Sequence, residues 1–142
     1  MDKLSVRFLK VEDMMTENVL SVDLQVLVKD AILMLLQNRI SGIPVVDEHK
    51  KLLSIVTEAD LMKFAAMGGL EKALTSFRDK MISTDRLITV KKGDPFSEVF
   101  KNLLLHPVRR IVVVDDFGHL QGVVSRSDVL KAFMRSEGYS AV

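Results

Sequence analysis

The chain of 142 residues contains no cysteine, and its 20 basic and 19 acidic residues leave a formal net charge of only +1. The lack of cysteine excludes disulfide bonds, thiolate nucleophiles and cysteine-based zinc or iron–sulfur sites. The balanced charge provides no general field for a polyanion, so nucleic acid is not an expected partner. The three histidines, His49, His106 and His119, do not have the spacing of zinc ligands.

Long apolar runs are also missing. Residues 1–10 carry several charges and no apolar run long enough for a signal peptide. Residues 31–36 are far short of the roughly 20 apolar residues that a membrane-spanning helix needs. We therefore expect a cytoplasmic protein with no membrane partner. With 48% hydrophobic residues, the chain is long enough for one ordinary domain or two small units that share a core.

An apolar helical face occurs twice, with identical spacing. The first set is Val28, Ala31, Ile32, Leu35 and Leu36, and the second is Phe96, Val99, Phe100, Leu103 and Leu104. The second set begins 68 residues after the first (96 minus 28). The same offset in residue number relates three further pairs of identical residues: Asp47 and Asp115, Leu52 and Leu120, and Val56 and Val124. The chain is therefore an internal duplication. Before the second helix, Asp94 and Pro95 predict an N-cap followed by proline at the first helical position.

Each repeat has the predicted order strand, helix, strand, strand, helix. The fold class is therefore mixed α/β, with two βαββα repeats packed about a pseudo-twofold axis, because one repeat is too small to bury a good core alone. The expected organisation is an N-terminal arm (1–12), a first repeat (13–68), a linker (69–78), a second repeat (79–137) and a C-terminal tail (138–142).

In both repeats, a β-branched run leads into a hydroxyl residue that is followed three residues later by aspartate. The pairs are Thr57 with Asp60 and Ser125 with Asp128. Either pair can be a capping box at a strand-to-helix junction, which is a purely structural role. Ser125 has no histidine placed by sequence to activate it, so an enzyme is not expected.

These motifs resemble a tandem pair of cystathionine-β-synthase (CBS) domains, a Bateman module. The likeness covers about residues 13–137 and rests on 41–47 (SGIPVVD) with 55–60 (IVTEAD), and on 109–115 (RRIVVVD) with 122–128 (GVVSRSD). The resemblance implies a regulatory module that binds an adenosine-containing ligand, is usually dimeric and is not an enzyme. Ser54 stands where the second repeat has Gly122, which adds a side chain where close backbone approach to a ligand is expected.

The resemblance also implies two clefts, each with a ribose-binding aspartate. The residues of the first are Asp128, Ser125, Ser127, Val123, Arg109, Arg110, Ser21, Ile40 and Ser41. The residues of the second are Asp60, Thr57, Ile55 and Thr89. Arg109 and Arg110 stand where some nucleotide-sensing relatives carry a basic pair for phosphate, or else form a solvated strand end, so the Asp128 cleft is expected to be the better site.

The expected ligand is AMP, ADP, ATP, NAD or S-adenosylmethionine, among which the sequence does not choose. Binding is expected to shift the population of conformations, or the dimer contacts, and so to regulate an unknown effector protein in trans. Helix faces at 61–67 and 129–134 are the candidates for a homodimer. The alternative is a structural dimerisation module with vestigial clefts, in which the hydroxyl–aspartate pairs only cap helices.

Overall fold

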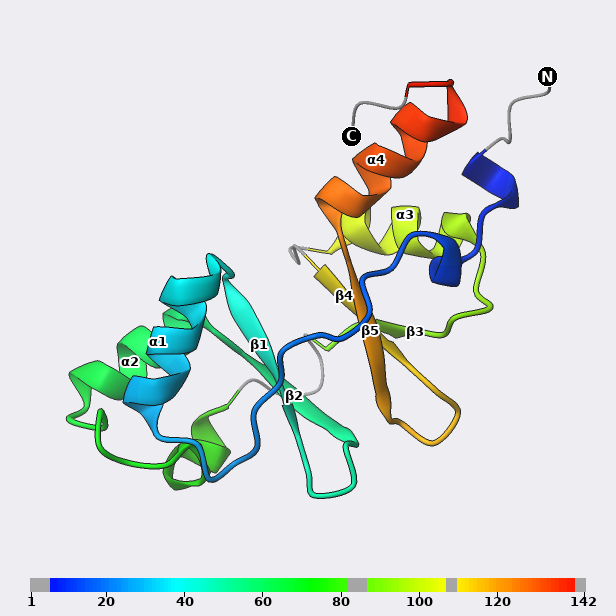
Figure 1. The fold of residues 1–142 in the computed structure, drawn as a ribbon. Helices are drawn as coiled ribbons and strands as arrows, with labels where there is room; N and C mark the ends of the chain where they lie inside the picture. Colours follow the sequence, from blue (N-terminus) through cyan, green and yellow to red (C-terminus); the bar gives the residue numbers. More distant parts are fainter. Residues whose placement is uncertain (1–5, 82–86, 107–109, 140–142) are drawn as a thin grey trace. The chain divides into compact units, whose positions relative to one another are not determined.

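Both repeats fold into a β-hairpin covered by two helices, as the computed structural model shows (Figure 1). The structure describes residues 6–81, 87–106 and 110–139. The chain divides into two compact units: unit 1 contains residues 1–19 and 88–142, and unit 2 contains residues 20–87. The mixed α/β class and the strand, helix, strand, strand, helix order are confirmed, although the first strand of the first repeat is reduced to a single bridge at Val22.

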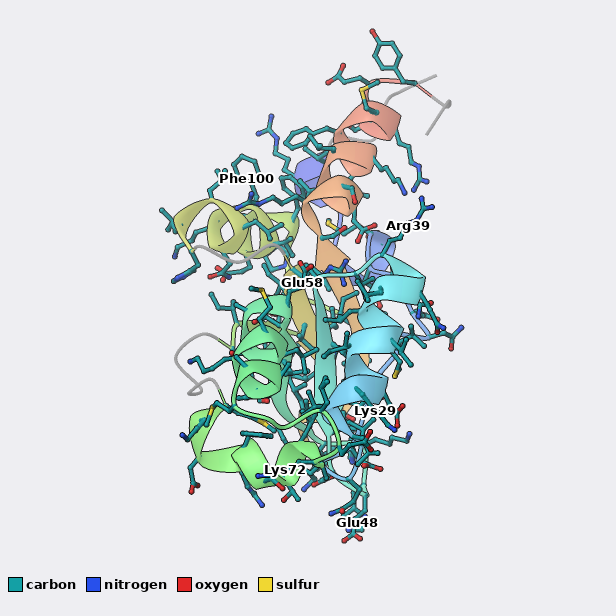
Figure 2. The ribbon with its side chains drawn as sticks, turned by 90° about the vertical axis from the view of Figure 1, so that its left-hand side faces the viewer. Lys29, Arg39, Glu48, Glu58, Lys72 and Phe100 are labelled. Carbon is teal, nitrogen blue, oxygen red and sulfur yellow. The ribbon has the colours of Figure 1, made fainter. Side chains whose placement is uncertain are left out.

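Unit 2 is built on an antiparallel hairpin of β1 (Gly42–Val46) and β2 (Leu52–Thr57), with α1 (Val28–Asn38) and α2 (Glu58–Ala66) packed together on it. Val22 adds a parallel bridge to Val45. Helix α1 stops because Arg39, at its end in Figure 2, has a left-handed backbone with φ of 52°. A 3-10 helix, Leu74–Lys80, follows α2.

Unit 1 contains a three-stranded sheet in the order β3 (Thr89–Val90), β4 (Arg110–Val114), β5 (Leu120–Ser125). Its helices are α3 (Phe96–Leu105) and α4 (Arg126–Ser136), and two short 3-10 helices, Val6–Phe8 and Val11–Asp13, belong to the same unit. The predicted cap of α3 is wrong by one residue. Pro95 is the N-cap, because the Asp94 carboxylate instead accepts the amide of Lys91 at 2.9 Å.

The two cores use matching positions, 68 residues apart. Buried residues of unit 2 include Val28, Ala31, Leu35, Ile43, Val45, Val56, Leu61 and Phe64. Their counterparts in the core of unit 1 are Phe96, Val99, Leu103, Ile111, Val113, Val124, Val129 and Ala132. The apolar faces predicted from helical spacing are thus the faces that fill each core.

The segment that precedes each repeat packs into the unit formed around the other repeat. Leu74 and Phe77, which precede the second repeat, lie in the core of unit 2. Val6 and Leu9, 68 residues earlier, pack against the core of unit 1, where Val11 is fully buried. Of the residues expected to form an arm, Val6, Leu9 and Val11 therefore contribute to the packing of unit 1.

Among the described residues, no helix is both long and apolar enough to cross a bilayer; α1 and α4 have 11 residues each.

Candidate ligand site

The junction of β5 and α4 carries the Ser125 and Asp128 pair, and its geometry is a complete capping box. The Ser125 hydroxyl accepts the amide of Asp128 at 3.3 Å. Asp128 Oδ2 in turn accepts the Ser125 amide at 2.9 Å and the Ser125 hydroxyl at 3.0 Å. The predicted capping role is confirmed, because these bonds satisfy amides that the first turn of a helix leaves without partners.

The first repeat reproduces this junction at Thr57 and Asp60. Asp60 Oδ2 accepts the Thr57 amide and the Thr57 hydroxyl, both at 2.9 Å, and the hydroxyl accepts the Asp60 amide at 3.3 Å. Asp60 is only 6% exposed, whereas Asp128 is partly exposed. The second carboxylate is therefore the more accessible to a solute.

Capping leaves part of each carboxylate available. All hydrogen bonds that Asp128 and Asp60 accept from described residues end on Oδ2. Oδ1 can therefore accept from an incoming hydroxyl, such as one of a ribose diol, without breaking the cap. Beside Asp128, the exposed Ser127 places its Oγ 2.9 Å from Oγ of Ser125.

Strand alternation decides where the other predicted residues point. Val124 of β5 is buried in the core of unit 1, so its neighbours Val123 and Ser125 project from the opposite face of that hairpin. In unit 2, Val56 of β2 is buried, so Ile55 and Thr57 project from the opposite face in the same way. The predicted strand residues thus share a face with the hydroxyl of the capping pair in both repeats.

Arg110 is the cross-strand partner of Ser125 at the start of β4, and it is half-buried. The equivalent pair in unit 2 is Gly42 with Thr57, which carries no charge. Directly opposed residues of an antiparallel pair lie close enough for their side chains to interact. At this cross-strand position, unit 1 therefore has a cation and unit 2 has a glycine. Arg109 lies outside the described residues.

The predicted partners from the first repeat lie in unit 2. The carbonyl of Ser41 accepts the first amide of α2, from Glu58, at 3.0 Å, so Ser41 lies beside Thr57 and Asp60. Ile40 packs against the core of unit 2, and Ser21 is half-buried before the Val22 bridge. Thr89 is exposed on β3 of unit 1. The joint use of Asp128 with Ser21, Ile40 and Ser41 remains a prediction.

A cavity of about 460 Å³ adjoins Asp128 within unit 1. Its lining combines the N-terminal segment with one face of α4: Leu9, Asp13, Met14, Met15, Thr16, Asp128, Lys131, Ala132, Arg135 and Ser136. Thr16 also pairs with Val123, its amide donating to the Val123 carbonyl at 2.8 Å. Thr16, Lys131 and Arg135 were not predicted. Thr16 could have been found, because Thr84 is its counterpart 68 residues later.

Among the described residues, no group of three histidine, aspartate or glutamate side chains could hold a metal ion. The polar side chains that line the cavity are two carboxylates, two hydroxyls and two basic groups: Asp13 and Asp128, Thr16 and Ser136, and Lys131 and Arg135. Such a set can exchange hydrogen bonds with an organic ligand that carries hydroxyl groups.

Comparison with known proteins gives a consistent family. The CBS domain model matches twice, at residues 11–66 and 78–135. The chain is 30% identical over 122 residues to inosine-5'-monophosphate dehydrogenase of Aquifex aeolicus, and 30% identical over 119 residues to the gamma subunit of 5'-AMP-activated protein kinase of Saccharomyces cerevisiae. These alignments cover 86% and 81% of this chain but only 24% and 37% of the relatives.

A solved structure extends the likeness to three dimensions. The structure of CBSX2 of Arabidopsis thaliana in complex with AMP has a TM-score of 0.77 and 27% sequence identity, and the match covers 91% of this chain and 98% of that one.

Proposed function

The chain belongs to the CBS domain family as a tandem pair of repeats, and we propose that it is a regulatory module that binds an adenosine-containing ligand. The observation that carries the proposal is the capped carboxylate of Asp128, which keeps Oδ1 available beside a cavity of about 460 Å³. AMP is the first ligand to test, because the structure of the similar protein CBSX2 is that of a complex with AMP.

Asp128, more than Asp60, is the ribose-binding residue in this proposal. Asp128 is the more exposed of the two, and Arg110 stands across the strands from its capping partner. A partly exposed carboxylate can exchange water for a diol at little cost, whereas a buried one must first be uncovered. The exposed amide end of α4 and the arginine both favour a ligand with a phosphate.

The ligand would act by shifting the population of conformations, and a partner in trans would sense the change. The chain spans 24% and 37% of the lengths of these two relatives. In this proposal, the CBS pair itself carries only the regulatory role. NAD and S-adenosylmethionine remain candidate ligands beside the adenosine phosphates, because a ribose diol is common to all of them.

Self-association is part of the proposal. Each unit exposes apolar residues at matching helix positions: Leu36 and Leu104 are 68% and 67% exposed, and Met62 and Leu130 are 72% and 64% exposed. Phe100 extends the face on α3 (Figure 2). Exposed apolar faces of this kind mark protein interfaces. Analytical ultracentrifugation would measure the mass of the particle in solution. We expect a dimer for the wild type and a monomer for Leu104→Lys.

Calorimetry with AMP, ADP, ATP, NAD and S-adenosylmethionine tests ligand binding. We expect at least one to bind, and Asp128→Asn to weaken it about tenfold or more, because the neutral amide can keep the cap but accepts more weakly from a diol. Asp60→Asn is the matched control at the other junction and should have the smaller effect. If none of the five compounds binds to the wild type, the ligand-binding proposal is wrong. The aspartates then only cap helices, and the alternative of a structural dimerisation module is favoured.

A further inference from the structure

The outer side of α3 and α4 carries exposed apolar side chains that belong to one surface of unit 1. Phe100 of α3 lies against Phe133 of α4, with ring centroids 5.9 Å apart, so the two helices adjoin there. Phe100 and Leu104 are four residues apart, as are Leu130 and Met134, so each pair lies on one side of its helix. These four side chains are 38%, 67%, 64% and 41% exposed. We call this surface the unit 1 face.

The unit 2 face is the matching outer side of α1 and α2, and its residues are smaller. The counterparts of the four residues of the unit 1 face are Ile32, Leu36, Met62 and Ala66. Leu36 and Met62 are 68% and 72% exposed, so the apolar character is kept. Ile32 and Ala66 are smaller than Phe100 and Met134, and Ala65 stands where unit 1 has Phe133. The unit 1 face is therefore bulky and the unit 2 face is not.

The helices that form the two faces also differ in net charge. Helices α3 and α4 contain four basic and two acidic residues, a net charge of +2, namely Lys101, Arg126, Lys131 and Arg135 with Glu98 and Asp128. Helices α1 and α2 contain two basic and three acidic residues, a net charge of −1, namely Lys29 and Lys63 with Asp30, Glu58 and Asp60.

One matched position reverses its sign between the units. The first residue of α4 is Arg126, whereas the first residue of α2 is Glu58 (Figure 2), and both are exposed. A contact between unlike faces joins net charges of opposite sign. A contact between like faces sets +2 against +2 and −1 against −1, and such like charges oppose association.

We propose that the chain forms an antiparallel homodimer, in which the unit 1 face of each chain packs on the unit 2 face of a second copy. This inference rests on the self-association in the proposed function and adds the arrangement of the two chains. A twofold axis produces two identical contacts of this kind, so each chain uses both of its faces.

Side-chain size favours the same arrangement independently of charge. Between two unit 1 faces, the large side chains Phe100, Phe133 and Met134 would meet their own copies. Against a unit 2 face, they meet Ile32, Ala65 and Ala66 instead. Helix surfaces pack densely when large residues of one enter the spaces left by small residues of the other. The bulky face and the smaller face are therefore better partners for each other than for themselves.

The test uses cross-linking, because the chain has no cysteine and a single introduced thiol is unique. Leu130→Cys places a thiol on the unit 1 face, and Met62→Cys, at the counterpart position, places one on the unit 2 face. One variant is isotopically labelled, the two are mixed and equilibrated, and a short bis-maleimide joins neighbouring thiols. Mass spectrometry then distinguishes the covalent dimers. We expect mixed dimers to exceed either like pair about tenfold, since like faces repel.

A second pair of variants, Leu104→Cys and Leu36→Cys, repeats the experiment on the other helix of each face. Analytical ultracentrifugation checks that every cysteine variant remains dimeric, and the second pair decides the question if a variant of the first pair is monomeric. A predominance of like pairs would overturn the antiparallel arrangement. A dimer in which none of the four thiols is cross-linked would overturn it as well, because these faces would then lie outside the interface.

Exchange of a matched residue tests the size argument. Ala66→Met puts the residue of the unit 1 face on the unit 2 face, where it meets a bulky partner in the antiparallel dimer. We expect the dissociation constant of the dimer to rise about tenfold, because added bulk at a packed contact is destabilising. A dimer of like units would instead set this methionine among small residues and keep or lower the constant, and that result would overturn the inference.

Phe117→Ala is the control, since Phe117 lies at a hairpin turn outside both faces and is 75% exposed. Its dissociation constant should match that of the wild type. A dimeric wild type with like-to-like cross-links overturns only the antiparallel arrangement, whereas a monomeric wild type overturns the self-association in the proposed function as well. Neither outcome bears on ligand binding, which calorimetry tests separately.

Discussion

Gly122 of β5 lies directly against the backbone of Thr16, so a methyl group added at Gly122 would stand 2.6 Å from the Thr16 carbonyl oxygen. Thr16 and Val123 exchange two backbone hydrogen bonds beside this point, of 2.8 and 3.1 Å. The sequence suggested that the glycine allows a ligand to approach. The structure shows that it allows the N-terminal segment to approach, which brings Thr16 to the edge of the cavity.

Gly122→Ser, which introduces the residue of the first repeat, should therefore destabilise unit 1. A side chain at 2.6 Å from a carbonyl forces the backbone to shift, and we expect a loss of about 1–3 kcal/mol in the free energy of unfolding, measured by denaturant titration. The reverse change, Ser54→Gly, is the control and should cost about 1 kcal/mol or less. An unchanged unfolding midpoint for Gly122→Ser would contradict the close packing of Thr16 on β5.

The helix caps give a second prediction. Ser125→Ala and Thr57→Ala each remove a hydroxyl that accepts a helix amide, so each should lower the free energy of unfolding by about 1 kcal/mol. Ser127→Ala is the control, because its side chain is exposed and accepts no helix amide in the capping box; its effect should stay within about 0.5 kcal/mol. Equal effects for Ser125 and Ser127 would mean that the box adds no stability.

Local sequence patterns predicted those features that depend only on residues close together in the sequence, namely the capping pairs and the apolar helix faces. The capping pairs are three residues apart, and the core faces of α1 and α3 follow from helical spacing, so both could be recognised without the fold. The cap at Asp94 was predicted wrongly, because its carboxylate accepts the amide of Lys91, three residues earlier, and α3 has no side-chain cap.

The cavity could not be predicted in this way, because it depends on contacts between distant segments. Thr16 meets Val123 across more than a hundred residues of sequence, and no local pattern specifies such a pairing. Two positions that carry buried phenylalanines in unit 2 carry smaller residues in unit 1, which is visible in the sequence only when the segments before the two repeats are themselves aligned. That alignment places Leu9 opposite Phe77 and Ala132 opposite Phe64.

The stacked rings of unit 2 give a third prediction. Phe64→Ala introduces the residue of the second repeat and should cost about 3–5 kcal/mol, because Phe64 is fully buried and its removal leaves a cavity against Phe77. Phe117→Ala is the control, since that ring is 75% exposed at a hairpin turn. Denaturant titration gives the free energy of unfolding of both variants and of the wild type. A loss no larger than that of the control would contradict the stacked pair.

The two hairpin turns make the stability depend on pH. The Asp47 carboxylate accepts the amides of Lys51 and His49, and these bonds hold its pKa below the ordinary value of 3.8. At Asp115, burial opposes ionisation, but bonds from the amide and ring of His119 and from the amide of Phe117 outweigh it, so its pKa is also lowered. Both groups are therefore more easily ionised in the folded chain than in the unfolded chain.

A lowered folded-state pKa stabilises the fold above the unfolded-state value, and this contribution is lost as the pH falls through the folded-state value. We therefore expect wild-type stability to decline once the pH drops below about 4, with further loss at lower pH. Asp115→Asn can still accept the turn amides through its carbonyl oxygen but does not titrate, so it should weaken this decline. The measurement is the thermal midpoint from neutral pH to about pH 2. Parallel curves for wild type and for the variant with both turn aspartates replaced by asparagine would rule out these carboxylates as a source of the acid dependence.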